Sequence, residues 1–121
     1  MSQTPKCAAP GCNSVQSDGT QNTAMGTRAL VMDLPGVSSN SGAGNTAAGY
    51  HALYPNTDGQ SNTALGSDAP NCNADGSYNT ASGYRALYFI TTGEGNTAIG
   101  FRALASDTTR MNNIGIGSDA G

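Results

Sequence analysis

The sequence predicts an all-β fold, a repetitive β-solenoid with coils of 17 residues. The main observation is a nine-residue unit, typified by NTAIGFRAL, whose first residue recurs as Asn22, Asn45, Asn62, Asn79, Asn96 and Asn113. From Asn45 onward the copies start 17 residues apart, and only the first interval is longer, at 23. Two further observations are a glycine at the fifth position of every copy and turn-forming dipeptides at one fixed place between copies. Repetition at a fixed period indicates one structural unit stacked on itself.

The composition suits a repeat architecture better than a conventional core. Of 121 residues, 36% are apolar, none is Trp and only 11% are charged, with a net charge of −3. The high charge of disordered chains is missing, and the strict period favours a repeat protein over a low-complexity tract. Five Lys and Arg residues are too few for a nucleic-acid interface, and no apolar run approaches the ~18 residues of a membrane helix. We expect neither nucleic-acid binding nor membrane insertion.

Residues 1–16 contain no copy of the unit, and Pro5, Pro10 and Gly11 interrupt any regular element there. We expect an irregular linker, attachment or cap segment, followed by the solenoid over residues 17–121. The first segment has one lysine but no apolar stretch, so it does not resemble a secretory signal.

The cysteine count is odd, with Cys7, Cys12 and Cys72. A local disulfide, an interchain disulfide and unpaired thiols are all compatible with this number. The Cys-x4-Cys spacing and the single histidine fit zinc poorly, so no metal site is expected.

Turn signals stand three residues ahead of the asparagine in four copies, as Asp18-Gly19, Asp58-Gly59, Asp75-Gly76 and Thr92-Gly93. Asp-Gly accepts a positive backbone φ, so we expect a tight turn at one corner of each coil. The segments between these turns and the fixed glycines are four to six residues long, which suits short strands and not helices. We expect two or three short strands per coil, coils ~4.8 Å apart and a stack about 30 Å long.

Two columns of the unit never vary. The fifth position indicates a bend or a close approach of backbones, and it is Gly26, Gly49, Gly66, Gly83, Gly100 and Gly117. The eighth position indicates a site where a methyl group fits and little else does, and it is Ala29, Ala52, Ala69, Ala86, Ala103 and Ala120.

Two other columns are mainly apolar. We expect the fourth position to face the interior, and it holds Met25, Ala48, Leu65, Ser82, Ile99 and Ile116. The ninth position supplies Leu30, Leu53, Leu87 and Leu104. An interior of about two or three small side chains per coil does not offset the entropy of ordering the coil. We therefore expect a homo-oligomer, a trimer, in which the Ala and Gly columns pack near a three-fold axis.

Asparagine and threonine begin every copy except the last, where Asn113-Ile114 replaces them. In a stack, identical residues lie above one another, and stacked asparagines satisfy their amides along the stack. We interpret both columns as structural ladders and not as ligand sites.

The units NTAAGYHALY, NTASGYRALY and NTAIGFRAL resemble the "NTAxGYxAL" repeats of phage tail fibres and related bacterial fibre proteins. They are more distantly similar to the "NSVAIG" repeats in the heads of YadA-like trimeric adhesins. The resemblance covers about residues 17–121. It implies intertwined or side-by-side β-coils in a homotrimer on a virion or cell surface. The chain has no coiled-coil stalk, membrane anchor or self-cleaving chaperone domain, so we expect a fragment or an unusually short member.

The candidate surface contacts form a strip of aromatic residues with basic neighbours, namely Tyr50, Tyr84, Phe101, Arg85 and Arg102. Stacking on sugar rings is one interpretation, and packing between neighbouring chains is the other. His51 belongs to a column of charged residues without an evident nucleophile or carboxylate partner, so we expect a solvated position. The aspartates of the Asp-Gly pairs are explained as turn residues, and neither calcium nor any other cofactor is expected. The insertion within residues 31–44 should project as a loop, either a contact site or a tolerated insertion.

The sequence is best interpreted as a structural or adhesive fibre module of a phage tail fibre or surface fibre, extracellular or on a virion. It would act as a trimeric shaft or as a contact element for a cell-surface glycan or receptor. An alternative is a self-assembling filament or lattice, because both solenoid ends look open and uncapped coils stack end to end. A third is a carbohydrate-binding adhesin tip. No nucleophile, base and orienting group can be assembled, so an enzyme is not expected.

Overall fold

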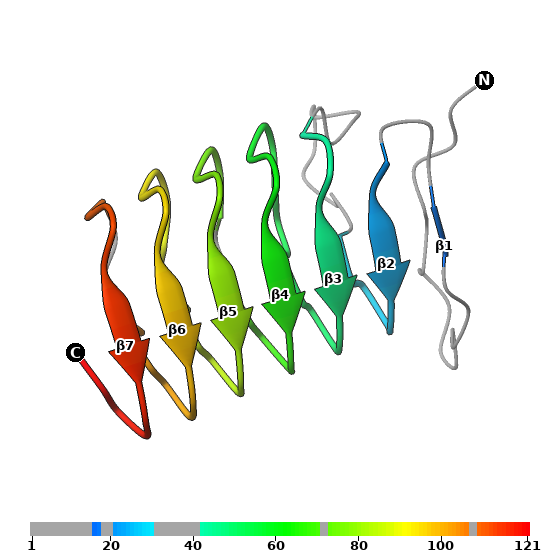
Figure 1. Cartoon of the computed structure of the whole chain (residues 1–121). Helices are drawn as coiled ribbons and strands as arrows, with labels where there is room; N and C mark the ends of the chain where they lie inside the picture. The colour runs from blue at the N-terminus through cyan, green and yellow to red at the C-terminus, as the bar shows by residue number, and fades with distance from the viewer. Residues whose placement is uncertain (1–15, 18–20, 31–41, 71–72, 107–108) are drawn as a thin grey trace.

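The computed structural model describes residues 16–17, 21–30, 42–70, 73–106 and 109–121. Among these residues the protein is all-β, without a helix, and forms one seven-stranded sheet in chain order (Figure 1). The strands are β1 (Gln16–Ser17), β2 (Thr23–Met25), β3 (Thr46–Ala48), β4 (Thr63–Leu65), β5 (Thr80–Ser82), β6 (Thr97–Ile99) and β7 (Ile114–Ile116). Strands β2 to β7 are parallel to one another, as coils of a solenoid require. The predicted β-solenoid is confirmed.

The register follows the repeat. From β3 to β7 each strand residue pairs with the residue 17 positions further along, as Thr46 does with Thr63. β2 and β3 keep this pairing across the longer first interval, so that Thr23 faces Thr46. The insertion that creates this interval lies mostly outside the described residues, as do all three cysteines.

Each coil contains one three-residue strand among its described residues, so the prediction of two or three strands per coil is wrong. The rest of the coil consists of turns and bends. These are held by backbone hydrogen bonds between adjacent coils, such as Leu53 N–H to the Ala69 carbonyl at 3.0 Å. Left-handed backbone conformations, for example at Arg85 and Leu87, turn the chain too often for a longer strand to form.

The inward-facing strand position is the third and not the fourth. The third-position alanines, for example Ala64, are fully buried, whereas Met25, Leu65 and Ile99 are each more than 40% exposed. Because the first asparagine points inward and successive strand side chains alternate, the second and fourth positions must point outward. The prediction that the fourth column lines the interior is therefore wrong.

The eighth-position alanines and ninth-position leucines fill the opposite wall of the interior. The alanines from Ala29 to Ala103 are completely buried, and Leu53 and Leu87 are also fully buried. Asparagine or isoleucine adds a further buried side chain, as Asn56, Asn73 and then Ile90 in successive coils. The interior thus holds more side chains per coil than the expected two or three small ones.

The glycine column bends the chain and brings backbones close together, as predicted. Gly26, Gly49, Gly66, Gly83 and Gly100 have φ between 120° and 131°. A Cβ atom on any of them would lie 2.5 to 2.9 Å from the carbonyl oxygen of the next glycine in the column. Such distances exclude a side chain, so the column requires glycine for both reasons.

The Asp-Gly corners are turns of a different kind from the one predicted. Gly59, Gly76 and Gly93 do not have positive φ. They are buried, and a Cβ on Gly93 would lie 2.5 Å from the carbonyl oxygen of Arg110 in the next coil. The positive φ occurs just before each asparagine, at Gln21, Gly44, Ser61, Tyr78, Gly95 and Asn112.

The predicted asparagine ladder is present and buried. In each step the side-chain Oδ1 accepts the backbone N–H of the next asparagine, as Asn62 Oδ1 does from Asn79 at 2.9 Å. The side-chain Nδ2 donates to the carbonyl of the corner glycine, as Asn79 does to Gly93 at 2.8 Å. The ladder therefore joins the strand to the corner and each coil to the next.

The N-terminal edge of the parallel stack is covered. β1 pairs with β2 in antiparallel orientation, with Gln16 opposite Ala24 and Ser17 opposite Thr23 (Figure 1). The expectation that both ends of the solenoid are open is wrong at this end, because the edge of β2 already has a partner. The remainder of segment 1–15 lies outside the described residues.

Candidate functional site

The aromatic strip, defined here as Tyr50, His51, Tyr54, Tyr84, Arg85, Tyr88, Phe101 and Arg102, lies along one edge of the stack. Its members follow the bends made by the glycine column. Tyr50, Tyr84 and Phe101 are 51%, 40% and 48% exposed, so the predicted contact residues do reach the surface.

His51 lies inside the N-terminal half of the strip and is not solvated as expected. Its ring stacks on Tyr50 at 3.9 Å and on Tyr54 at 4.9 Å between centroids. Its Nδ1 is 3.4 Å from a carboxylate oxygen of Asp68 in the next coil, and only 18% of the side chain is exposed. The Nε2 atom is buried and has no hydrogen-bond partner among the described residues. The sequence gives no local sign of this arrangement, because Asp68 becomes a neighbour only through stacking.

The C-terminal half of the strip is built around Arg85. Its guanidinium carbon lies 5.0 Å from the ring centre of Tyr84 and 4.8 Å from that of Tyr88, within cation–π range. The ring of Tyr84 also stacks on Phe101 of the next coil, with centroids 5.6 Å apart. The Arg85 Nε atom is buried without a hydrogen-bond partner in the described part of the chain.

This geometry limits how sugars can bind. A sugar ring stacks on the face of an aromatic ring, and the Tyr84 ring already meets Phe101 and the Arg85 guanidinium. Tyr84 therefore has less free ring surface for a sugar than Tyr50 or Phe101, which remain about half exposed.

Ionisable side chains in the seventh position pair along the stack. His51 faces Asp68, and Arg102 lies 3.7 Å from a carboxylate oxygen of Asp119. The Arg102 and Asp119 side chains are both more than half exposed, so this pair adds little stability. Its effect is to reduce the net charge of this edge.

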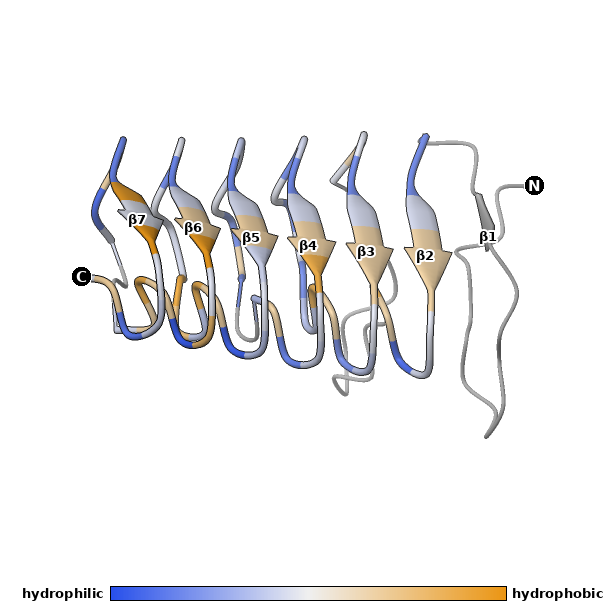
Figure 2. Ribbon diagram, turned by 60° about the horizontal axis from the view of Figure 1, so that its bottom comes forward, coloured by the Kyte–Doolittle hydropathy of each residue, from blue (hydrophilic) through white to orange (hydrophobic). Residues whose placement is uncertain are grey.

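A second surface, the sheet face, is the outward side of β2 to β7. It is defined here as the second and fourth positions of the unit, and it carries no ionisable side chain in any of these six strands. Its large exposed apolar residues are Met25, Leu65, Ile99, Ile114 and Ile116. In Figure 2 the strongest apolar colours of these strands lie at the end of β4, at the end of β6 and at both ends of β7.

The sequence prediction misses this face because it places the fourth column inside the coil. One signal does distinguish the two sides. The buried eighth-position alanines are uniform in size, whereas the fourth position varies from alanine and serine to methionine, leucine and isoleucine. An interior of constant width takes residues of constant size, and a column that varies this much indicates a surface.

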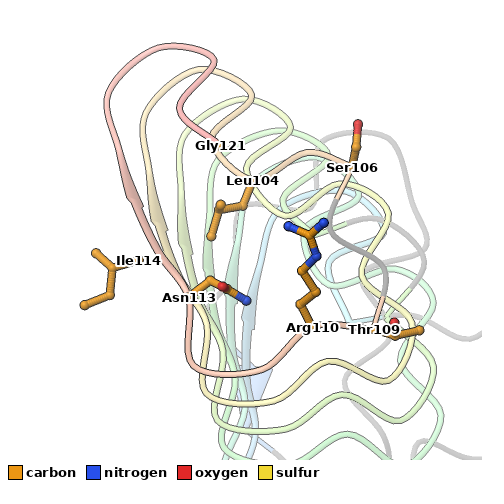
Figure 3. Close-up of a pocket in the computed structure, with 7 residues that line it drawn as sticks. All are labelled: Leu104, Ser106, Thr109, Arg110, Asn113, Ile114 and Gly121. Carbon is orange, nitrogen blue, oxygen red and sulfur yellow. The ribbon is translucent and has the colours of Figure 1, made fainter.

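A third feature is a pocket of about 520 Å³ at the last coil. It is lined by Leu104, Ser106, Thr109, Arg110, Asn113, Ile114 and Gly121 (Figure 3). Leu104 and Asn113 continue the internal columns of the preceding coils. The pocket therefore lies at the end of the solenoid interior, where Ser106, Thr109, Arg110 and Asn113 give it a largely polar lining.

Within the described ranges, no group of three or more His, Cys, Asp or Glu side chains is arranged to hold a metal ion. The same residues include no helix long and apolar enough to cross a membrane. No protein-family model, curated protein or solved structure matches the chain.

Proposed function

We propose that this chain is a homotrimeric module of a phage tail fibre or a similar surface fibre, exposed on a virion or cell surface. It serves as a shaft segment or receptor-contact element and performs no catalysis. The observation that carries the proposal is the stack of parallel coils in uninterrupted register, which gives a repetitive element whose outer face is uncharged and bears exposed apolar side chains. Large apolar side chains that recur along one exposed face are typical of a surface that meets a partner.

Measurement of the native mass tests the oligomer directly. Light scattering and native mass spectrometry of the purified chain should give three copies. A stable, folded monomer at micromolar concentration would contradict the proposal. Receptor contact is tested separately on glycan arrays, where loss of binding in a Tyr84→Ala, Phe101→Ala variant would assign it to the aromatic strip.

End-to-end polymerisation is less well supported. Continuation of one solenoid by another requires a free strand edge at both ends. The edge of β2 is paired with β1, so a second molecule must displace β1 before it can stack there. Electron microscopy of the purified protein should therefore show short discrete rods and no long filaments.

A further inference from the structure

The size of the side chains on the sheet face varies regularly along the stack. Its fourth position is large in β2, β4 and β6, with Met25, Leu65 and Ile99, and small in β3 and β5, with Ala48 and Ser82. Accordingly, the three large side chains are exposed whereas the two small positions are only half-buried steps between them. From β2 to β6 the face thus alternates between large and small residues, and the alternation ends at β7, where the large Ile116 follows Ile99.

The exposure of the second-position threonines alternates in the same way. Thr46 and Thr80, beside the small residues, are exposed, whereas Thr23, Thr63 and Thr97, beside the large residues, are partly covered. The large side chains therefore shield their own strand, and the small residues leave the threonine side chains open. The space at β3 and β5 can take up side chains of a partner whose large residues are spaced in the same way.

Charge and spacing both point to a second copy of this chain as the occupant. The sheet face carries no ionisable group, so identical faces can meet without bringing like charges together. The corner ahead of the asparagines carries the carboxylates Asp58, Asp75 and Glu94, and a self-contact there would bring like charges together. A second copy also has the same coil spacing, so equivalent large and small residues lie at matching heights from β2 to β6.

We infer that the copies in the proposed trimer meet through the sheet face and not through the Ala and Gly columns, which are buried within each chain. This inference rests on the proposed oligomer. Around a three-fold axis parallel to the stack, equivalent residues form layers. Layers of Met25, Leu65 and Ile99 extend over the space left by the layers of Ala48 and Ser82, as alternating large and small residues do in packed cores.

The test replaces the small residues of the sheet face with large ones. A variant with Ala48→Leu and Ser82→Leu adds apolar surface outside the coil, so a chain with no contact there folds as before. In the interlocked contact these leucines collide with the large layers, and we expect at least tenfold weaker association by analytical ultracentrifugation. Gln60→Leu with Glu94→Leu is the matched control, because both residues are exposed at equivalent corner positions. Its association constant should stay within about twofold of wild type.

A second variant tests the same contact without adding side-chain volume, so it applies even if the Ala48→Leu, Ser82→Leu chain fails to fold. Leu65→Ala with Ile99→Ala removes two large side chains and should also weaken association at least tenfold. Unchanged or tighter association of the filled variant would overturn the interlocked face. So would dissociation by Tyr84→Ala with Phe101→Ala alone, although the proposed oligomer would then stand. A monomeric wild type would instead overturn the oligomer itself.

Discussion

At Gly83 the backbone has a φ of +130°, and an added Cβ would lie 2.5 Å from the Gly100 carbonyl oxygen. Gly117, in the same column, has a φ of +122° but no atom within 4 Å of its added Cβ. The two positions share the backbone conformation and differ in the neighbour. Substitutions at the two positions therefore separate the free-energy cost of a positive φ from the cost of the close contact with the next coil.

We predict that Gly83→Ala lowers the free energy of unfolding by about 3 kcal/mol or more, because strain at positive φ adds to a backbone collision. Gly117→Ala should lower it by only about 1–2 kcal/mol, from the conformation alone. Urea denaturation followed by circular dichroism measures both. Equal losses of unfolding free energy in the two variants would show that contact with the next coil does not exclude a side chain at Gly83.

The asparagine ladder gives a second prediction for single residues. Replacing Asn79 with alanine removes the acceptor of the Asn96 N–H and the donor to the Gly93 carbonyl, both at buried sites. Two unpaired buried backbone groups should cost about 2–4 kcal/mol of unfolding free energy. Asn113→Ala is the control, because its side chain is only part-buried. A loss at Asn113 as large as that at Asn79 would contradict the role assigned to burial.

At the scale of one strand, β3 offers the same substitution on opposite sides. Ala47 is 1% exposed and points into the coil, whereas Ala48 points outward. We predict that Ala47→Leu lowers the free energy of unfolding by about 1–3 kcal/mol or more, because the interior has no room for the added atoms. The loss should be the same at every protein concentration in urea denaturation.

Ala48→Leu should behave differently in the same experiment. It adds no atom to the interior, so it should change the stability of the isolated chain by less than about 0.5 kcal/mol. Any larger loss should grow with protein concentration, because it acts on association between chains. If both substitutions were equally damaging in dilute solution, the assignment of inner and outer sides in β3 would be wrong.

For the whole molecule, the period itself can be tested by removing one coil. Deletion of residues 62–78 removes 17 residues and places Asn79 where Asn62 stood, after Ser61. We predict a folded, shorter stack with only a moderate loss of stability, because each coil contacts mainly its neighbours. Size-exclusion chromatography and circular dichroism provide the measurement.

Deletion of residues 62–77 is the matched control, because it removes 16 residues and shifts every later column by one place. Inward alanines would then face outward and the asparagines would leave the ladder. The protein should be largely unfolded. A well-folded product from this deletion would show that the columns do not fix the register.

The 17-residue spacing of the asparagines, by itself, determined the length of the coil and the pairing of Thr46 with Thr63 and its successors. Identical residues stack in register because their side chains satisfy one another only at equal heights. The constant glycines determined the bend, since all six have a positive φ that other residues rarely adopt and five of them, from Gly26 to Gly100, also leave no space for a Cβ atom.

Tertiary structure decided which side of the strand is inside. Alternation places Ala64 and Leu65 on opposite sides, but either side can in principle face the interior. The choice depends on the width left by the opposite wall, where leucines such as Leu53 and Leu87 already fill the space. Only a methyl group fits between them, so the alanine turns inward and the larger residue remains outside. The closeness of His51 to Asp68 was decided in the same way, by the stacking of coils.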